Sequence, residues 1–209
     1  MNNLIIALSG ASHSGKTTFM DAMKKKYPDS VILLNEEIRD LEIGDIDTIR
    51  QDPNAYLELE FKIIQAKIDS EREINNNYNN KVVLVDRSLV DSYFYYTFYV
   101  DKSNLSPDHM IKYHEFLNKL YDSMMSHCNS LYDYIYFLDP ITSLTRMDKY
   151  TQKSLKYTQQ NEYNLMKTLT FGITNNKQKI CLFNKEKDAQ EMEEIMYQFI
   201  QTGKTSWIL

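Results

Sequence analysis

The sequence is poor in the two residues that most often make a chain flexible. Of its 209 residues only 5 are glycine and 4 are proline, against averages of about 7% and 5%. This scarcity excludes flexible linkers, collagen-like repeats and proline-rich tails. Hydrophobic residues make up 43% of the chain and charged residues 25%, so the chain can bury a core and is not disordered. The length fits one α/β domain or, as the weaker alternative, two small ones, and we expect a single domain over residues 1–209.

Cysteine is scarce as well. Cys128 and Cys181 are the only two, and their spacing matches neither a C-x-x-C motif nor a Cys/His metal-ligand pattern. We favour the interpretation that they are two buried thiols in a reducing compartment.

The chain also lacks an excess of positive charge and any long apolar run. Its formal net charge is −5 and its pI about 5.4, which argues against binding duplex nucleic acid through its phosphates. A phosphorylated small molecule needs only a local positive site. The apolar run Leu4–Leu8 is too short for a signal sequence, and no stretch reaches the roughly 18 apolar residues that span a bilayer. We therefore expect a cytoplasmic protein with no membrane partner.

Short apolar runs alternate with longer segments of helical period. Five runs are typical of buried strands, namely Leu4–Leu8, Val31–Leu34, Val82–Val85, Tyr134–Leu138 and Ile180–Phe183. Helices are expected over residues 16–26, 53–74, 87–100, 106–127, 142–171 and 189–200. Pro53 and the pair Ser106-Pro107 suit helix starts, and Gly172 suits a helix end. The asparagine-rich stretch 75–80 is expected to be a solvated loop.

Continuous apolar strands separated by helices predict an α/β fold, a doubly wound five-stranded parallel sheet with helices on both faces. Ligands of such sheets bind outside the carboxyl ends of the strands. The segments that follow the five strands should therefore surround one site.

Two of the few glycines belong to a phosphate-binding pattern. Residues 10–17, Gly-Ala-Ser-His-Ser-Gly-Lys-Thr, match G-x-x-x-x-G-K-[ST] in full. In such a loop the backbone N–H groups converge on phosphates, and the following helix adds its positive end. We expect Lys16 to reach the β- and γ-phosphates of ATP and Thr17 to hold Mg²⁺. A glycine-rich surface turn is the weaker alternative, because it explains neither the preceding buried strand nor the Lys-Thr pair.

The predicted nucleotide-binding residues are Gly10, Ser12, His13, Ser14, Gly15, Lys16, Thr17 and Thr18. His13 stands at a variable position of the pattern and has no expected catalytic role. Asp86 ends the third strand, where a carboxylate beside the phosphate loop can hold Mg²⁺ directly or through water. The alternative for Asp86 is a helix N-cap, with Arg87 and Ser88 in the first turn. Asp86 could hold Mg²⁺ and cap the helix at the same time.

These residues resemble the P-loop nucleoside and nucleotide kinases, which include thymidylate kinases, deoxynucleoside kinases and AAA-type kinase-like ATP-binding domains. Thymidylate kinases carry D-R-Y after the third strand and deoxynucleoside kinases carry E-R-S, and Asp86-Arg87-Ser88 is intermediate. The spacing to Asp91, with Tyr95 downstream, looks closest to the AAA-type branch. The motifs cover the chain from Leu4 to Asp91, and the remainder resembles the family only in layout.

The resemblance implies an acceptor site around Arg87 and Asp91, because the family's arginine contacts the acceptor end of the substrate. The alternative is a salt bridge between these two residues. Glu36 and Arg39 follow the second strand and reproduce a Glu–Arg spacing of related kinase-like domains, with both residues on one helical face. A hydroxyl acceptor would give Glu36 the role of general base, whereas a phosphate acceptor would favour Arg39. An exposed charged turn also explains the pair.

Family members carry a lid after the fourth strand, which would fall at residues 142–156 here. Arg146 would there stabilise the transferred phosphoryl group. Known lids usually carry several arginines, whereas Arg146 is accompanied by Lys149, Lys153 and Lys156, which a solvated helix face explains equally well. The aromatic run 93–99 could stack on the acceptor, but a core helix is the favoured interpretation for most of it.

The resulting hypothesis is transfer of the γ-phosphoryl group of ATP, with Mg²⁺, to a small nucleoside or nucleoside monophosphate. The predicted catalytic residues are Lys16, Glu36, Asp86, Arg87 and Arg146. A nucleotide-binding regulatory module or slow NTPase is the alternative. GTP is disfavoured, since no N-K-x-D motif follows the fourth strand. A polynucleotide 5′ kinase is a further alternative that the acidic pI disfavours. The sequence leaves a homodimer open.

Overall fold

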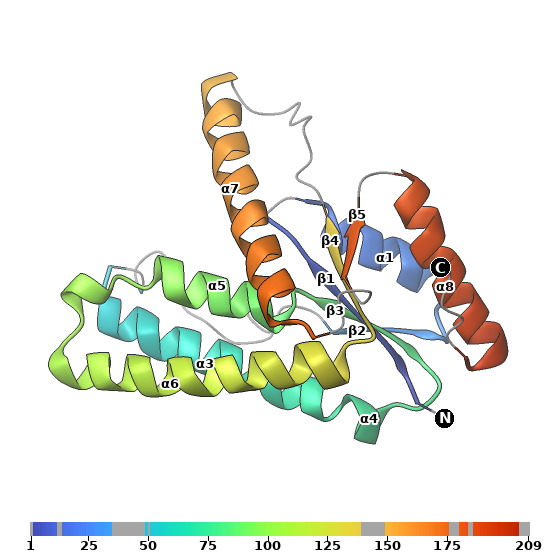
Figure 1. Cartoon of the computed structure of the whole chain (residues 1–209), viewed down its shortest axis with the longest axis horizontal. Coiled ribbons are helices and arrows are strands. Elements are labelled where there is room, and N and C mark those ends of the chain that lie inside the picture. Colours follow the sequence, from blue (N-terminus) through green and yellow to red (C-terminus); the bar gives the residue numbers. More distant parts are fainter. Residues whose placement is uncertain are drawn as a thin grey trace.

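The computed structural model describes residues 2–11, 14–34, 49, 51–138, 149–175, 180–183 and 186–204. The five apolar runs form one sheet, as predicted. Its strands are β1 (Leu4–Ser9), β2 (Val31–Leu34), β3 (Val82–Asp86), β4 (Tyr134–Leu138) and β5 (Ile180–Phe183). Within the described residues their order is β2-β3-β1-β4-β5 and every pairing is parallel. β1 therefore lies at the centre, between β3 and β4 (Figure 1).

Apart from the terminal residues Ser9 and Asp86, the strands are apolar because both faces of the sheet are covered. All residues of β1, β3 and β4 are buried. Alternate side chains point to opposite faces, so Ile5 and Ala7 join one core cluster while Leu4, Ile6 and Leu8 join the other.

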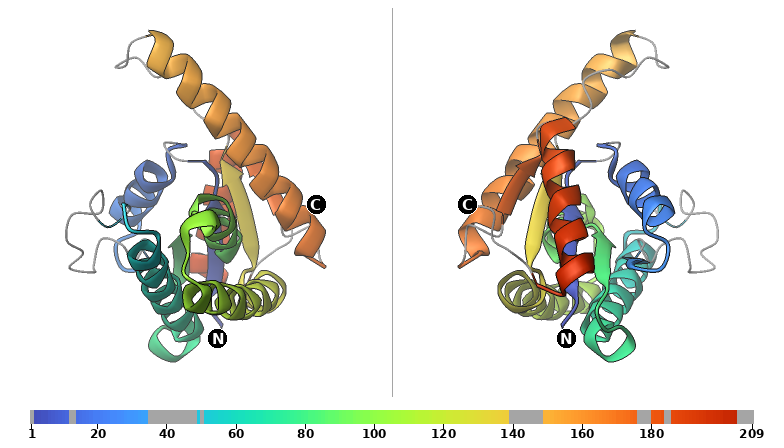
Figure 2. Two further views of the ribbon diagram at one scale, coloured as in Figure 1. Left: turned by 90° about the vertical axis from the view of Figure 1, so that its left-hand side faces the viewer. Right: turned by 90° about the vertical axis from the view of Figure 1, so that its right-hand side faces the viewer.

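Helices cover both faces. On one face, α1 (Lys16–Lys26) and α8 (Glu186–Thr202) contribute Met20, Met23, Met192, Ile195, Met196 and Phe199 to the core. The other face carries α3 (Pro53–Arg72), α5 (Leu89–Tyr99), α6 (Pro107–Ser126) and α7 (Lys149–Ile173). In Figure 1 these two groups lie on opposite sides of the strands, and in Figure 2 one end of α7 projects beyond the sheet. The doubly wound prediction is confirmed.

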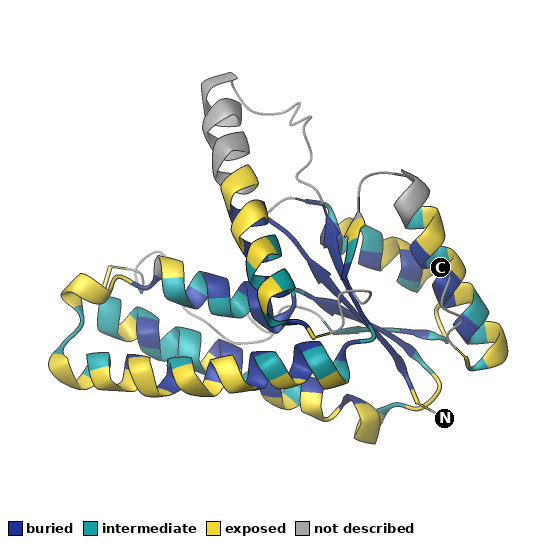
Figure 3. Ribbon diagram, viewed as in Figure 1, coloured by how far each residue is buried: buried dark blue, intermediate teal, exposed yellow. Residues whose placement is uncertain are grey.

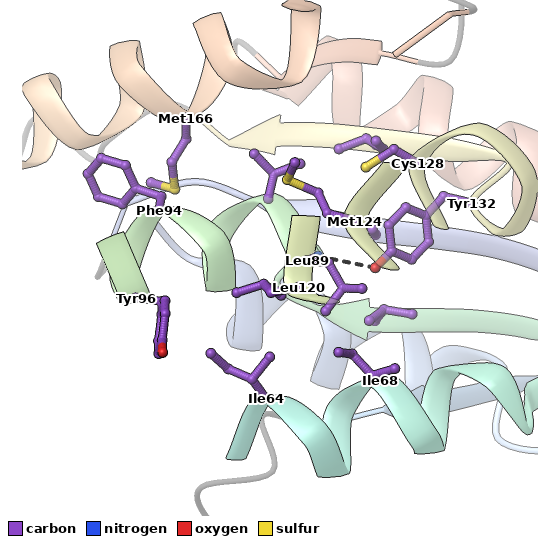
Figure 4. Packing of buried hydrophobic residues seen from close by; sticks show 14 of the residues in the cluster. Ile64, Ile68, Leu89, Phe94, Tyr96, Leu120, Met124, Cys128, Tyr132 and Met166 are labelled. Carbon is purple, nitrogen blue, oxygen red and sulfur yellow. Dashed lines mark hydrogen bonds between the residues drawn. The ribbon is translucent and has the colours of Figure 1, made fainter. Parts of the chain in front are cut away.

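The larger core cluster lies under α3, α5, α6 and α7. Ile64 and Ile68 of α3, Phe94 of α5, Leu120 of α6 and Met166 of α7 meet there (Figure 4). The outward faces of α3 and α6 are polar and exposed (Figure 3). In the aromatic run, Phe94 and Tyr96 are buried, in line with the favoured core-helix interpretation, whereas Phe98 is exposed. Cys128 is buried as expected, but Cys181 is only half-buried.

Local signals identified the starts of α1, α3 and α6 to within one residue. The last helix begins at Glu186 and ends at Thr202, beyond the expected bounds 189–200, and α5 begins at Leu89 and not at residue 87. Ser106 caps α6, since its hydroxyl accepts a hydrogen bond from the N–H of His109, and Pro107 is the first helical residue. Pro53 similarly opens α3, where the Asp52 side chain accepts from two backbone N–H groups. Short elements complete the described chain, namely α4 (Ile74–Asn77), the 3₁₀ turn η2 (Lys102–Asn104) and the π-helical η3 (His127–Leu131).

Three further expectations about helix ends were wrong. The helix expected to reach residue 74 ends at Arg72, and part of the asparagine-rich stretch forms α4 instead of a loop. Gly172 lies inside α7 and does not terminate it. The end of α7 is held by Asn129, whose side-chain amide donates to the carbonyl of Ile173 at 3.3 Å. Within the described residues, no helix has the length and apolar character needed to cross a bilayer.

Candidate functional site

The loop between β1 and α1 has the backbone that its glycines predict. Gly10 and Gly15 have φ values of 137° and 92°, a region that side chains other than glycine rarely adopt. A Cβ atom at Gly10 would lie 2.7 Å from the carbonyl oxygen of Leu138 in β4, closer than packed atoms allow. Gly10 is therefore required by both conformation and space, and Gly15 forms the N-cap of α1.

Lys16 is buried and folded back against this loop. Its Nζ donates to the carbonyl oxygens of Gly10 and Ala11, both at 2.9 Å, and to Ser14 Oγ at 3.2 Å. These partners carry no full charge. A phosphate in the loop would compete for the ammonium with stronger, charge-assisted hydrogen bonds.

The first turn of α1 suits an anion and a metal ligand. It contains no acidic residue, so no carboxylate within this turn offsets the positive end of the helix dipole. Thr17 is half-buried and Thr18 is exposed in this turn. Of the predicted nucleotide-binding residues, Ser12 and His13 lie outside the described residues.

Asp86 lies beside the loop because of the strand register. β1 and β3 pair with Leu8 opposite Asp86, so the loop and the Asp86-Arg87-Ser88 motif leave the sheet side by side. Asp86 is buried, and it does not cap a helix: the N-cap of α5 is Ser88. That alternative for Asp86 is therefore wrong.

Arg87 has an unusual backbone conformation for a non-glycine residue. Its φ is 67°, which costs about 1–3 kcal/mol and persists only where the surroundings enforce it. Its N–H donates to the carbonyl of Leu8 at 3.0 Å. Its guanidinium carbon lies 4.8 Å from the centre of the Tyr95 ring, and the Tyr95 hydroxyl in turn donates to Glu162 of α7 at 3.4 Å. The Tyr95 ring thus contacts Arg87, the arginine for which the family resemblance predicts a contact with the acceptor.

The Asp91 carboxylate accepts hydrogen bonds from side chains and backbone of the protein itself. Its Oδ2 accepts from the Ser9 hydroxyl at 2.6 Å and from the hydroxyl and N–H of Ser88, both at 2.8 Å. Its Oδ1 accepts from the N–H of Gly10 at 3.3 Å. The side chain is 0% exposed, which does not fit the substrate contact predicted from the sequence. We infer that Asp91 holds the phosphate loop and the start of α5 together.

Sequence reasoning missed a polar network behind Asp86. The ammonium of Lys67 donates to the Asp86 carbonyl at 3.1 Å and forms a 2.8 Å ion pair with Glu71 Oε1. Glu71 Oε2 accepts from the Tyr132 hydroxyl at 2.6 Å and lies 2.8 Å from His127 Nδ1. All four of these side chains are buried. The available signal was the i, i+4 spacing of Lys67 and Glu71 on the apolar face of α3.

The charges within this network hold Glu71 ionised. Burial by itself would raise the pKa of Glu71, but the positive charge of Lys67 and the hydrogen bond with His127 outweigh burial and keep that pKa below its usual value. Burial and the neighbouring Glu71 carboxylate raise the pKa of Tyr132 well above normal, so its hydroxyl keeps its proton and acts as a donor.

Several predicted acceptor residues fall outside the described part of the chain. These are Glu36, Arg39 and Arg146, together with residues 142–148 of the expected lid. The side chains of Lys149, Lys153 and Lys156 also lie outside it, although their backbone belongs to α7.

The oxygen atoms around the loop suit Mg²⁺ held jointly with a nucleotide. Mg²⁺ usually takes one or two protein oxygens and completes its shell with phosphate and water. The Thr17 hydroxyl, in the first turn of α1, and the Asp86 carboxylate, at the end of β3, are oxygen atoms of this kind. Among the described residues, no group of three or more His, Cys, Asp or Glu side chains gathers for a separate metal site.

Comparison with known proteins agrees with this geometry. A family model described as an AAA domain matches residues 5–169. A search of curated proteins finds no match.

The fold also resembles solved structures, including that of a deoxyadenosine kinase. The deoxyadenosine kinase from M. mycoides with bound dATP has a TM-score of 0.61 and 15% identity, covering 93% of this chain and 100% of the kinase. The same enzyme with dCMP and a flexible dCDP has a TM-score of 0.59 and 14% identity, covering 95% and 100%. The NadR protein in complex with NR has a TM-score of 0.58 and 15% identity, covering 99% of this chain and 54% of NadR. The chain thus spans about half the length of NadR, and these likenesses show a P-loop kinase fold.

Proposed function

This chain belongs to the AAA domain family, and we propose that it is an ATP-dependent phosphotransferase acting on a small nucleoside or nucleoside monophosphate. The observation that carries the proposal is the pairing of Leu8 with Asp86. It sets a complete phosphate-binding loop beside a carboxylate and an arginine. Likeness to a deoxyadenosine kinase over that enzyme's full length supports the proposal.

The donor nucleotide would bind at residues 10–18. The backbone N–H groups of the loop and the N-terminus of α1 would hold the β- and γ-phosphates, and Lys16 would exchange its loop oxygens for phosphate oxygens. Thr17 and Asp86 would hold Mg²⁺. When bound, the metal neutralises charge that develops on the phosphates.

The acceptor would bind at Arg87. Its guanidinium is oriented by the Tyr95 ring, and a cation–π contact of this kind is worth about 0.5–2 kcal/mol. Because β2 and β4 run parallel to β3 and β1, their carboxyl ends lie at the same edge of the sheet. We propose that Glu36 takes the proton of a hydroxyl acceptor, or that Arg39 binds a phosphate acceptor. Arg146 would stabilise the transferred phosphoryl group from a lid at residues 142–156.

Transfer of label from γ-³²P-ATP tests the proposal. The acceptor panel contains nucleosides, nucleoside monophosphates, nicotinamide riboside and a single-stranded oligonucleotide. We expect a labelled small molecule with the wild type and none with Lys16→Ala. Lys25→Ala is the matched control, because Lys25 is exposed on the same helix, and it should keep full activity.

The same assay separates the alternatives. Labelling of no acceptor, with ATP hydrolysis unchanged by any of them, would favour a slow NTPase or regulatory module and refute the proposal. Labelling of the oligonucleotide alone would indicate a polynucleotide kinase. Label transfer that is unchanged in Lys16→Ala would mean that the phosphate loop is not required for the reaction.

A further inference from the structure

Directly behind Asp86, α3 presents a buried pair of opposite charges. Lys67 is 5% exposed and Glu71 is 0% exposed. Removing two charges from water costs several kcal/mol per ion, and apolar residues of similar size often stabilise a fold equally well. The Lys67–Glu71 pair is therefore a poor device for stability alone. Its position relative to Asp86 offers a more specific role.

Lys67 holds one particular peptide unit. Its ammonium donates to the carbonyl of Asp86 at 3.1 Å. The N–H of the same peptide unit belongs to Arg87 and donates to the carbonyl of Leu8 at 3.0 Å. The peptide between Asp86 and Arg87 is thus bound at both ends. Its orientation fixes ψ of Asp86 and the strained φ of Arg87, and hence the directions in which both side chains leave the backbone.

Glu71 in turn holds Lys67. The carboxylate is fixed from its other side by the Tyr132 hydroxyl and by His127 of η3. The Tyr132 hydroxyl also accepts from the N–H of Leu89, the first residue of α5 (Figure 4). The network therefore joins α3 and η3 to both sides of the Asp86-Arg87-Ser88 turn.

We propose that Lys67, anchored by Glu71, is a positioning residue that orients Asp86 for Mg²⁺. The inference rests on the proposed function only in assigning Mg²⁺ to Asp86. Partners that orient a metal ligand without touching the metal typically change metal affinity by about 10–100-fold when they are removed. Lys67 acts on Asp86 in this way through a backbone carbonyl.

The test removes both charges together, because an apolar substitution of Lys67 alone would leave the Glu71 carboxylate buried without a partner on that side. In Lys67→Met/Glu71→Gln the side chains keep similar volumes, and the new amide oxygen can still accept from Tyr132. Binding of a fluorescent ATP analogue is measured in EDTA and across a Mg²⁺ titration, with thermal unfolding alongside. We expect unchanged binding in EDTA and a Mg²⁺ half-saturation concentration raised by about 10–100-fold.

The matched control is Glu58→Gln/Lys112→Met. It removes an exposed ion pair that joins Glu58 of the same helix α3 to Lys112 of α6, with a 2.6 Å Nζ–Oε1 distance. Its Mg²⁺ dependence should equal that of the wild type. A second variant, Lys67→Gln, keeps a polar partner for Glu71 but is neutral and shorter than lysine. It should show the same Mg²⁺ defect if the double variant does not fold.

Three results would overturn the proposal. One is a folded variant with the wild-type Mg²⁺ dependence. Another is an equal loss of binding with and without Mg²⁺, or unfolding of both variants, since either assigns the pair a structural role. The third is wild-type nucleotide binding that ignores Mg²⁺. Because the binding assay contains no acceptor, failure of the phosphotransferase proposal would appear separately, as missing label transfer by the wild type.

Discussion

The hydroxyl of Ser9 donates a 2.6 Å hydrogen bond to the carboxylate of Asp91 across 82 positions of sequence. Ser9 ends β1 just before the phosphate loop, and Asp91 lies in the first turn of α5. Asp91 also accepts from the N–H of Gly10 and from Ser88. One buried carboxylate therefore joins the proposed donor side of the site to the proposed acceptor side.

Because Asp91 connects the phosphate loop to the start of α5, Asp91→Asn should lower both the stability of the protein and its affinity for nucleotide. In either orientation the amide would direct an N–H group at donors, either those of Ser9 and Ser88 or the N–H of Gly10. We expect the free energy of unfolding to fall by about 1.5–3 kcal/mol, the scale of a hydrogen bond to a charged group, with weaker binding of an ATP analogue. Urea unfolding and nucleotide titration measure the two effects. Asp122→Asn, at an exposed position on α6, should change neither, and a loss of stability with full nucleotide affinity would contradict the joint role.

Two glycines give opposite predictions for the same substitution. In Gly10→Ala the new Cβ would meet the Leu138 carbonyl at 2.7 Å at a φ of 137°, so we expect nucleotide binding weakened by about 5–150-fold from strain of about 1–3 kcal/mol. In Gly172→Ala the new Cβ meets nothing within 4 Å, inside α7. It should stabilise the protein by about 0.5–1 kcal/mol because alanine favours helix. Calorimetric nucleotide binding and thermal unfolding are measured for both variants. Equal changes in nucleotide affinity and in unfolding temperature for the two variants would refute the prediction.

The parts of the fold and site that could be predicted were those encoded by neighbouring residues. The strand that ends in Ser9, the glycines of the loop and the Ser106-Pro107 helix start all carry their signal within a few positions. Gly172 misled because its local signal was overridden by Asn129, a residue 44 positions from the carbonyl that it caps.

The roles of the three charged residues Lys67, Asp86 and Asp91 needed the tertiary structure. Asp86 ends an apolar strand and Asp91 lies in the first turn of the helix that follows. Both are buried, so only the strand register and the hydrogen bonds distinguish the proposed metal ligand from the buried tether. The contact between Lys67 and Asp86 exists because β3 pairs beside β1 and α3 packs behind it. No pattern of spacing in the sequence specifies that packing.

The contact between Arg87 and Tyr95 predicts a defect confined to the acceptor. Tyr95→Leu removes the ring 4.8 Å from the guanidinium, so the acceptor KM should rise by roughly threefold to thirtyfold, as expected for loss of about 0.5–2 kcal/mol. Affinity for the ATP analogue should not change. Tyr95→Phe is the control, because it keeps the ring and loses only the hydrogen bond to Glu162. An equal rise in the acceptor KM in both variants would assign the effect to loss of the hydrogen bond between Tyr95 and Glu162, and not to loss of the ring.

The buried Glu71 carboxylate predicts a specific acid sensitivity. Its pKa is lowered in the folded protein from an ordinary value of 4.5, because the attraction of Lys67 and the hydrogen bond with His127 outweigh the effect of burial. A carboxyl group with a lowered folded pKa contributes stability that is complete above its unfolded pKa and is lost as the pH falls through the folded pKa. Below about pH 4.5 the free energy of unfolding of the wild type should therefore fall faster than that of Lys67→Met/Glu71→Gln. Urea unfolding from pH 7 down to pH 3 measures both slopes. The other carboxyl groups are common to the two proteins, so parallel slopes would mean that Glu71 is not held ionised in the native state.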